Sequence, residues 1–399
     1  AGGALDGHID KSRTVWIGHS RGGEGVARAY DRIVTGSYSP QNYELADVLV
    51  VSSISPTDFG TRARPTDSNY HLIYGSSDGD VRGSVGGGSK PFAIYERGTG
   101  NKHVTYLQGA DHNDFNCCGF DDFTGPAGTA IGRPEVQRVA MIDWLALIQQ
   151  YVRGNEPARD VMERQWESLD FPALADSTVV DSEYRPARGG ADFVVDDFQT
   201  QASTTLASSG ATVSVGVSNI FEGLMRDADG SYSWTGSDAM NGMSRVRPSS
   251  IDDTRGATFS WNGSDVAYAY TLLPIHRDVS GFAALSFRAC QISRAPETTA
   301  ALEDLTFTVT LVDGSGVSSS INVGSYGGGV EEPYQRTGDG TGAGWSNEFE
   351  TITISLGDFL RDGSALDLGD IEQVRFEFGP GFGSSQGRIG LDDVEFRAE

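Results

Sequence analysis

The chain has 399 residues, 38% of them hydrophobic, and a formal net charge of −25 at pH 7. This length suggests two or more domains, and the acidity argues against a nucleic acid partner, because phosphate binding needs a basic surface. The longest apolar runs, 144–148 and 266–270, are too short to cross a membrane. Nearly all the positive charge comes from arginine, a composition that fits a secreted, extracellular protein.

The cysteines are too few for a disulfide-bonded scaffold. Cys117 and Cys118 are adjacent, and Cys290 lies far away in a strand-like run. We expect buried thiols. A bridge involving Cys117 or Cys118 is the alternative.

Residues 1–155 read as an α/β unit in which short apolar segments alternate with helical ones. Apolar strands that are not interrupted by polar residues are typical of a parallel sheet covered on both faces. Strands are expected at 14–18, 47–54, 71–74 and 103–107, and helices at 24–35 and 134–153.

The remainder divides into two parts. Residues 156–190 contain one short helical stretch followed by several Pro and Gly residues, and they are expected to be a helical connector. From 191 to 399, apolar and polar residues alternate in many short segments, as in 305–311 and 374–378. This pattern predicts an all-β sandwich of two sheets.

The sharpest motif is Gly18-His19-Ser20-Arg21-Gly22, which fits the pattern G-x-S-x-G. It follows an expected strand and precedes an expected helix, which is where a nucleophile elbow stands. Such a turn exposes the Ser20 hydroxyl above the sheet. The helix N-terminus, with the Arg21 N–H, then faces the developing oxyanion.

A serine nucleophile needs a base, and in this kind of fold an acid and then a histidine follow it along the chain. Asp78 follows the third expected strand and is our candidate for the acid, with Asp80 in reserve. His112 follows the fourth strand and is the candidate base. His19 is expected to point away from the reacting atom.

With these motifs, residues 14–153 resemble the C-terminal half of an α/β-hydrolase. The segments GHSRGG, GSSDGDV and GADHND are most similar to the dienelactone-hydrolase and polyester-hydrolase branch of that superfamily. The resemblance implies a triad of Ser20, Asp78 and His112 that needs no cofactor. It also implies a substrate cleft whose walls are Pro56, Thr57, Phe59 and Phe115.

One feature departs from that family, which has about four strands before the elbow, whereas only 19 residues precede Ser20 here. The sequence is therefore interpreted as a fragment, with a processed product or one subunit of a pair as alternatives. The first strand is expected to have an open edge. Efficient turnover is not expected from the chain as written.

Two metal sites were weighed from acidic clusters. Residues 111–122 contain Asp, His and Cys but lack the paired spacing of a zinc site, so metal is not expected there.

The C-terminal part resembles a jelly-roll carbohydrate-binding module. Such modules often hold a structural calcium, for which Asp197 and Asp393 are the candidates. Aromatic candidates for stacking on sugars are Trp234, Trp261, Tyr326, Tyr334 and Trp345.

These observations predict a secreted serine hydrolase that cleaves carboxylic esters, with an accessory β-sandwich that holds it near a polysaccharide or polymer surface. A non-catalytic glycan- or surface-binding protein with a degenerate hydrolase half is the alternative. A serine peptidase of the prolyl-oligopeptidase type would use the same triad, but it is ranked lower because the chain has a C-terminal β-sandwich and no propeller repeat is visible in it.

Overall fold

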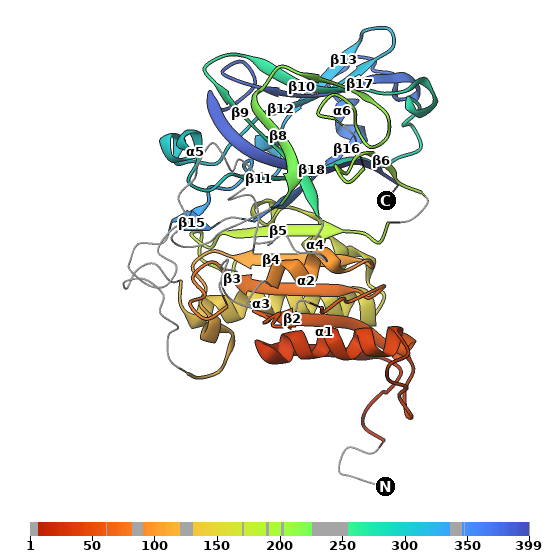
Figure 1. Cartoon of the computed structure of the whole chain (residues 1–399), viewed down its shortest axis with the longest axis vertical. Helices are drawn as coiled ribbons and strands as arrows, with labels where there is room; N and C mark the ends of the chain where they lie inside the picture. Colours follow the sequence, from red (N-terminus) through yellow and green to blue (C-terminus); the bar gives the residue numbers. More distant parts are fainter. Residues whose placement is uncertain are drawn as a thin grey trace.

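The structure is a computed structural model of the chain. It describes residues 7–60, 62–81, 91–119, 131–169, 171–188, 191–200, 203–225, 254–335, 345–346 and 348–398. An α/β unit formed by the N-terminal half lies against a β-sandwich formed by the C-terminal half (Figure 1). Strand β5 (Val180–Arg185) lies on the side of the α/β unit that faces the sandwich.

The α/β unit contains a five-stranded sheet in the order β1-β2-β3-β4-β5. The first four strands run parallel, as their uninterrupted apolar sequences predict, and β5 is antiparallel to β4. β1 is an edge strand of this sheet, also as expected. The other strands of the sheet are β1 (Thr14–His19), β2 (Val48–Ile54), β3 (Tyr70–Gly75) and β4 (Lys102–Leu107).

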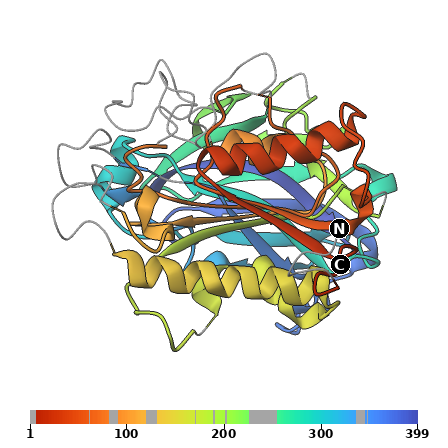
Figure 2. The same ribbon diagram turned by 90° about the horizontal axis from the view of Figure 1, so that it is seen from below.

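Helices cover both faces of this sheet. Helix α1 (Arg21–Val34) lies on one face and α3 (Arg133–Leu147) on the other (Figure 2). The short helix α2 (Pro91–Arg97) packs in the same apolar cluster as α1, whereas Val136 and Val139 of α3 belong to a separate cluster. The sheet therefore has two buried faces, and its strand ends are the edges left for a site.

Two elements differ from the sequence expectation. Strand β5 lies inside the stretch interpreted as a connector, which otherwise contains α4 (Asp160–Glu163) and the 3₁₀ helix η5 (Trp166–Ser168). Its sequence, VDSEYR, shows no apolar run because its charged side chains are buried against the other unit. Helix α2 is too short for its periodicity to stand out in the sequence.

The C-terminal half is an antiparallel sandwich of two sheets, as the alternating pattern predicts. One sheet has the order β13-β12-β17-β10-β7, and the other has β16-β11-β18-β9-β8 with β6 beside β18. Phe307, Val309, Val374 and Phe376 face the shared core.

The strands of the sandwich are β6 (Phe193–Asp196), β7 (Thr212–Val215), β8 (Ser218–Leu224), β9 (Arg255–Asn262), β10 (Val266–Thr271), β11 (Ala284–Gln291), β12 (Thr308–Asp313), β13 (Ser318–Asn322), β16 (Glu350–Ser355), β17 (Ile371–Phe378) and β18 (Gln386–Arg397). Two short strands, β14 (Tyr334–Gln335) and β15 (Trp345–Ser346), pair with each other, and the helices are α5 (Pro296–Ala301) and α6 (Leu356–Phe359).

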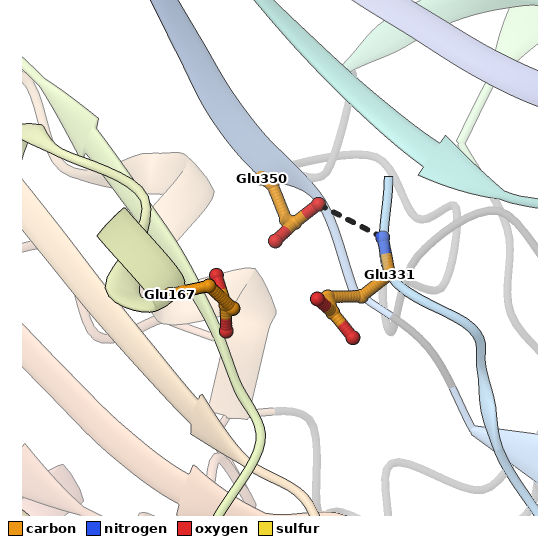
Figure 3. Close-up of side chains that lie close together, drawn as sticks. All are labelled: Glu167, Glu331 and Glu350. Carbon is orange, nitrogen blue, oxygen red and sulfur yellow. Dashed lines mark hydrogen bonds between the residues drawn. The ribbon is translucent and has the colours of Figure 1, made fainter. Parts of the chain in front are cut away.

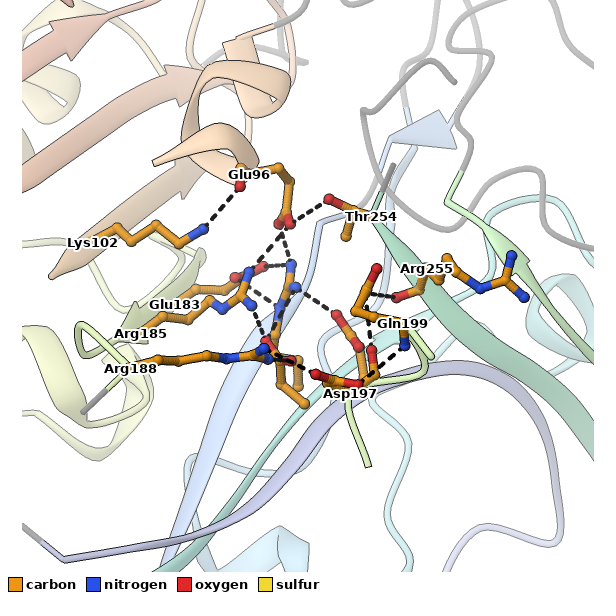
Figure 4. A network of polar contacts seen from close by, with 12 residues as sticks. Glu96, Lys102, Glu183, Arg185, Arg188, Asp197, Gln199, Thr254 and Arg255 are labelled. Carbon is orange, nitrogen blue, oxygen red and sulfur yellow. Dashed lines mark hydrogen bonds and ion pairs between the residues drawn. The ribbon is translucent and has the colours of Figure 1, made fainter. Parts of the chain in front are cut away.

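A buried ionic network joins the two units (Figure 4). Arg288 of β11 pairs with Glu96 of α2 at 2.7 Å, with Glu183 of β5 at 3.1 Å and with Asp392 of β18 at 2.7 Å. Arg185 of β5 also pairs with Glu96, at 3.2 Å. The carboxylates around these arginines are buried, so removing one partner leaves a buried charge uncompensated.

Among the helices that the structure describes, none has the length and apolar character needed to cross a membrane.

Candidate active site

The G-x-S-x-G motif forms a tight turn between β1 and α1. Ser20 has φ 57° and ψ −122°, a conformation that costs about 1–3 kcal/mol for a residue with a side chain. A Cβ on Gly18 would lie 2.1 Å from the Gly22 carbonyl oxygen, which explains why a glycine stands there. The Ser20 N–H donates to the Ile54 carbonyl of β2 at 2.8 Å, so the neighbouring strand holds the turn in place.

Helix α1 starts at Arg21, directly after the serine. The first N–H groups of a helix have no acceptor within the helix, and the helix dipole places partial positive charge there. The predicted oxyanion donor, the Arg21 N–H, therefore stands at a position suited to binding negative charge. Its role in an oxyanion hole stays a prediction.

The predicted base and acid lie in contact. His112 opens the 3₁₀ helix η2 (His112–Phe115) after β4, and Asp78 follows β3. His112 Nδ1 is 2.8 Å from Asp78 Oδ2, and both side chains are buried. Because β3 and β4 are parallel neighbours, the loops after their carboxyl ends meet at the same edge of the sheet.

Asp78 is itself held firmly. Its Oδ1 accepts the N–H groups of Asp80 at 2.9 Å and of Val81 at 2.6 Å. Two main-chain donors fix the carboxylate so that Oδ2 faces the imidazole. The geometry therefore favours Asp78 over Asp80, whose carboxylate is 67% exposed and lies 3.7 Å from the other ring nitrogen, Nε2.

His19 contacts His112, and its expected orientation away from the reacting atom stays a prediction. Its Nε2 lies 3.0 Å from the His112 carbonyl oxygen, and the two rings are 4.5 Å apart between centroids. Burial and the neighbouring His112 lower the pKa of His19. The sequence offered no signal for this contact, because the end of β1 and the start of η2 are 93 positions apart.

The four residues predicted to form the cleft have different surroundings. Thr57 is buried and donates to Glu24 of α1 at 2.8 Å, and Pro56 packs near Gly23. Phe59 is exposed, with the Arg21 guanidinium 5.7 Å from its ring centre. Phe115, at the end of η2, is partly buried and packs on apolar residues. Of these four, Phe59 alone has a largely exposed side chain, and the role of all four in substrate binding stays a prediction.

Glu24 organises this loop and was missed in the sequence. Its carboxylate accepts the Thr57 hydroxyl and the N–H groups of Phe59 and Gly60. Burial by itself would raise the pKa of Glu24, but these hydrogen bonds hold it below its ordinary value. A glutamate in the first turn of the helix after the elbow was the available signal, since helix N-termini favour acids.

A second Ser-His-Asp arrangement lies inside the same sheet. Ser52 Oγ is 2.9 Å from His71 Nδ1, and His71 Nε2 is 3.6 Å from Asp143. All three side chains are fully buried, and Ser52 also accepts the Trp144 indole N–H at 3.2 Å. Ser20 is partly exposed. Accessibility therefore distinguishes the candidate site from this internal polar cluster.

The acidic segment after His112 is built around the helix η2. Asp111 caps it by accepting the N–H groups of Asn113 and Asp114, and Asp114 accepts the Asp111 N–H in return. These contacts give both carboxylates a structural role. Asp121 and Asp122 lie outside the described residues.

The cysteine expectation was wrong for Cys117 and Cys118, which are exposed, with their sulfur atoms 2.8 Å apart. They follow η2 in an exposed segment and do not lie in a core strand. Cys290 is buried in β11, as expected.

The carboxylates of Asp197 and Asp393 do come together, but around an arginine. Arg188 contacts Asp197 at 3.0 Å and Asp393 at 2.6 Å, and Arg185 also pairs with Asp393. The guanidinium groups supply the positive charge that the sequence interpretation assigned to calcium. A calcium site on these two residues stays a prediction.

The aromatic residues considered for sugar stacking are mostly engaged elsewhere. Trp261 is buried in the sandwich core, and Tyr326 donates its hydroxyl to Asp358. The Tyr334 hydroxyl accepts from Ser77, next to Asp78, at 3.1 Å. Trp234 and the side chain of Trp345 lie outside the described part of the chain.

No family model matches the sequence, and no curated protein does. Solved structures that show likeness include the family 11 carbohydrate-binding module of the cellulase Lic26A-Cel5E of Clostridium thermocellum, with 13% identity, 53% of this chain and 96% of that chain covered, and a TM-score of 0.28. A family 30 carbohydrate-binding module matches at 9% identity over 51% of this chain and 90% of that chain, also with a TM-score of 0.28.

A β-1,2-glucanase from Parabacteroides distasonis matches at 11% identity over 52% of this chain and 25% of that chain, with a TM-score of 0.26. These weak likenesses concern half of the chain, and they do not bear on a serine hydrolase.

Proposed function

We propose that this chain carries the catalytic residues of a serine hydrolase that cleaves carboxylic esters. The observation that carries the proposal is the contact of His112 Nδ1 with the buried Asp78, beside an elbow that holds Ser20 at positive φ. Loops after parallel strands bring these three residue types to one edge of the sheet. This placement supports the proposal, because nucleophilic acyl transfer needs a serine, a histidine and an acid side by side.

In the proposed reaction, His112 Nε2 takes the proton of the Ser20 hydroxyl as Oγ forms a bond to the ester carbonyl carbon. Asp78 keeps the proton of the ring on Nδ1 and stabilises the imidazolium. The Arg21 N–H binds the oxyanion. His112 then gives its proton to the departing alkoxide, which leaves as an alcohol. A water molecule, deprotonated by the same nitrogen, hydrolyses the acyl-serine.

The test is covalent labelling of the full-length protein with a fluorophosphonate, followed by mass spectrometry of the labelled peptide, together with hydrolysis of p-nitrophenyl butyrate. Label on Ser20, lost in Ser20→Ala and in His112→Ala, supports the proposal. Ser37→Ala is the matched control, because Ser37 is an exposed serine on the turn after α1. Absence of label and of esterase activity would exclude the function. Faster cleavage of peptide amides than of esters would favour a peptidase.

We propose as a second function that the β-sandwich binds a polysaccharide and holds the hydrolase near its substrate, in a secreted protein. The supporting observation is a cavity of about 610 Å³ between the connector and the sandwich. Its lining is mostly polar and includes Arg164, Tyr326, Asp358 and Arg361, the kinds of side chain that hydrogen-bond sugar hydroxyl groups.

Glycan-array binding by the whole chain tests this second function. Binding that weakens in Arg361→Ala but persists in Ser20→Ala would support it. Binding to no glycan, or binding unchanged in Arg361→Ala, would count against this cavity. Glycan binding with no esterase activity would leave the chain a binding protein.

A further inference from the structure

Three glutamates converge where the connector meets the sandwich. Glu167 lies in η5, Glu331 in the loop after Val330, and Glu350 at the start of β16 (Figure 3). One carboxylate oxygen from each can be chosen so that all three lie within 4.8 Å of one another. Glu331 and Glu350 lie 164 or more positions after Glu167 in the sequence, so only the tertiary structure brings the three together.

Glu350 offers an oxygen that the protein leaves without a partner. Its side chain is 1% exposed, and its Oε2 accepts the Glu331 N–H at 3.1 Å. Its Oε1 is buried and has no hydrogen-bond donor among the described residues. A buried carboxylate oxygen without a donor is costly, and a bound cation would offset that cost.

The charges around the cluster have the same sign. Asp181 of β5 and Asp304 are two further carboxylates that interact electrostatically with Glu331. In the described residues, the ion pairs of the nearby arginines go to other carboxylates, such as the pairs of Arg288 with Glu96 and Glu183.

We propose that Glu167, Glu331 and Glu350 bind a divalent cation with the chemistry of calcium. Calcium binds carboxylate oxygens at about 2.3–2.6 Å, so that two of its ligand oxygens are at most about 5 Å apart. The separation within 4.8 Å therefore suits a common ion. Magnesium needs a near-ideal octahedron and usually retains several waters, so three protein carboxylates favour calcium.

The bound ion would stabilise the contact between the α/β unit with its connector and the β-sandwich. Glu167 belongs to the connector beside the α/β unit, whereas Glu331 and Glu350 belong to the sandwich. Gln108 of the α/β unit donates to the Glu332 carbonyl at 3.1 Å, so a hydrogen bond already links the two units close to this cluster. This site differs from the one that the sequence suggested on Asp197 and Asp393.

The experiment measures calcium binding to the whole chain, by calorimetry after chelator treatment and by the melting temperature in calcium and in EDTA. We expect one strong site per chain and a higher Tm in calcium. Glu350→Gln and Glu331→Gln should weaken binding at least tenfold. Glu303→Gln is the matched control, because it removes one exposed charge close to Glu332 without removing a ligand.

The Glu350→Gln variant also gives a test that does not depend on whether the substitution changes the stability of the fold. In Glu350→Gln, calcium should raise the Tm far less than it raises the Tm of the wild type, whatever the Tm of each protein in EDTA. Asp197→Asn should bind calcium as the wild type does. No calcium binding, binding unchanged in Glu350→Gln, or binding lost only in Asp197→Asn would each overturn the proposal.

Discussion

His112 Nδ1 lies 2.8 Å from Asp78 Oδ2, and Asp78 is held in turn by two main-chain N–H groups. The imidazole therefore has one defined tautomer, with its proton on Nδ1 and its lone pair on Nε2. The orientation of the ring depends on a carboxylate that cannot easily rotate.

Replacing Asp78 with asparagine tests this dependence. Asp78→Asn can donate as well as accept, so it allows the wrong tautomer and should lower kcat for an ester about 10⁴-fold. Asp80→Asn should change kcat far less, because Asp80 is exposed and does not contact Nδ1. Steady-state kinetics with p-nitrophenyl butyrate decide it. Equal losses in the two variants would show that Asp78 is not the orienting acid.

Because Ser20 has a positive φ, we expect that replacing it can raise the stability of the protein while removing its activity. Ser20→Gly should abolish ester hydrolysis but raise the free energy of unfolding by about 1 kcal/mol, because glycine adopts positive φ without steric cost. Ser20→Ala should lose activity without this gain, since alanine retains a Cβ. Urea denaturation of both variants provides the comparison. A glycine variant no more stable than the alanine variant would show that the turn is not strained.

His103 predicts a loss of stability in acid. Burial lowers its pKa to about 3, and neither ring nitrogen has a hydrogen-bond partner in the described residues. The folded-state pKa is thus below the unfolded value of about 6.5, so the contribution of His103 is complete above pH 6.5 and declines as the pH falls toward 3. Protonation in the unfolded chain should cost about 2 kcal/mol between pH 7.5 and 5.

His103→Phe removes this titration and should make the unfolding free energy less dependent on pH over that interval. The two proteins should be compared by urea denaturation at pH 7.5 and at pH 5. If the wild type and the variant lose the same stability in acid, His103 does not stay neutral in the fold.

Arg288 predicts a large effect at the junction of the two units. It faces Glu96, Glu183 and Asp392, all buried. Arg288→Met would leave these carboxylates without their main counter-charge and should destabilise the protein by about 3–5 kcal/mol. Arg361→Met, at an 81% exposed arginine paired with Asp358, should cost no more than about 1 kcal/mol. Thermal unfolding of both variants tests the contrast.

Much of the candidate site could be predicted because its signals are local. The glycines around Ser20 are required by a turn a few residues long, and the positions of Asp78 and His112 after apolar strands place them at one edge of any parallel sheet. The contact between His19 and His112 could not be predicted, because it depends on how two loops pack. Glu24 was missed because its acceptors come from the separate loop at 57–60.

The sequence by itself determined the alternation that makes the sandwich, the parallel strands and the serine turn, since each follows from steric and hydrophobic preferences over a few residues. The tertiary structure decided the rest. It placed β5 in the sheet, put Arg188 between Asp197 and Asp393, and gathered Glu167, Glu331 and Glu350. Charged residues can reach across a whole chain to a partner, as Arg288 does to Glu96 over 192 positions, and no local pattern encodes which partner they find.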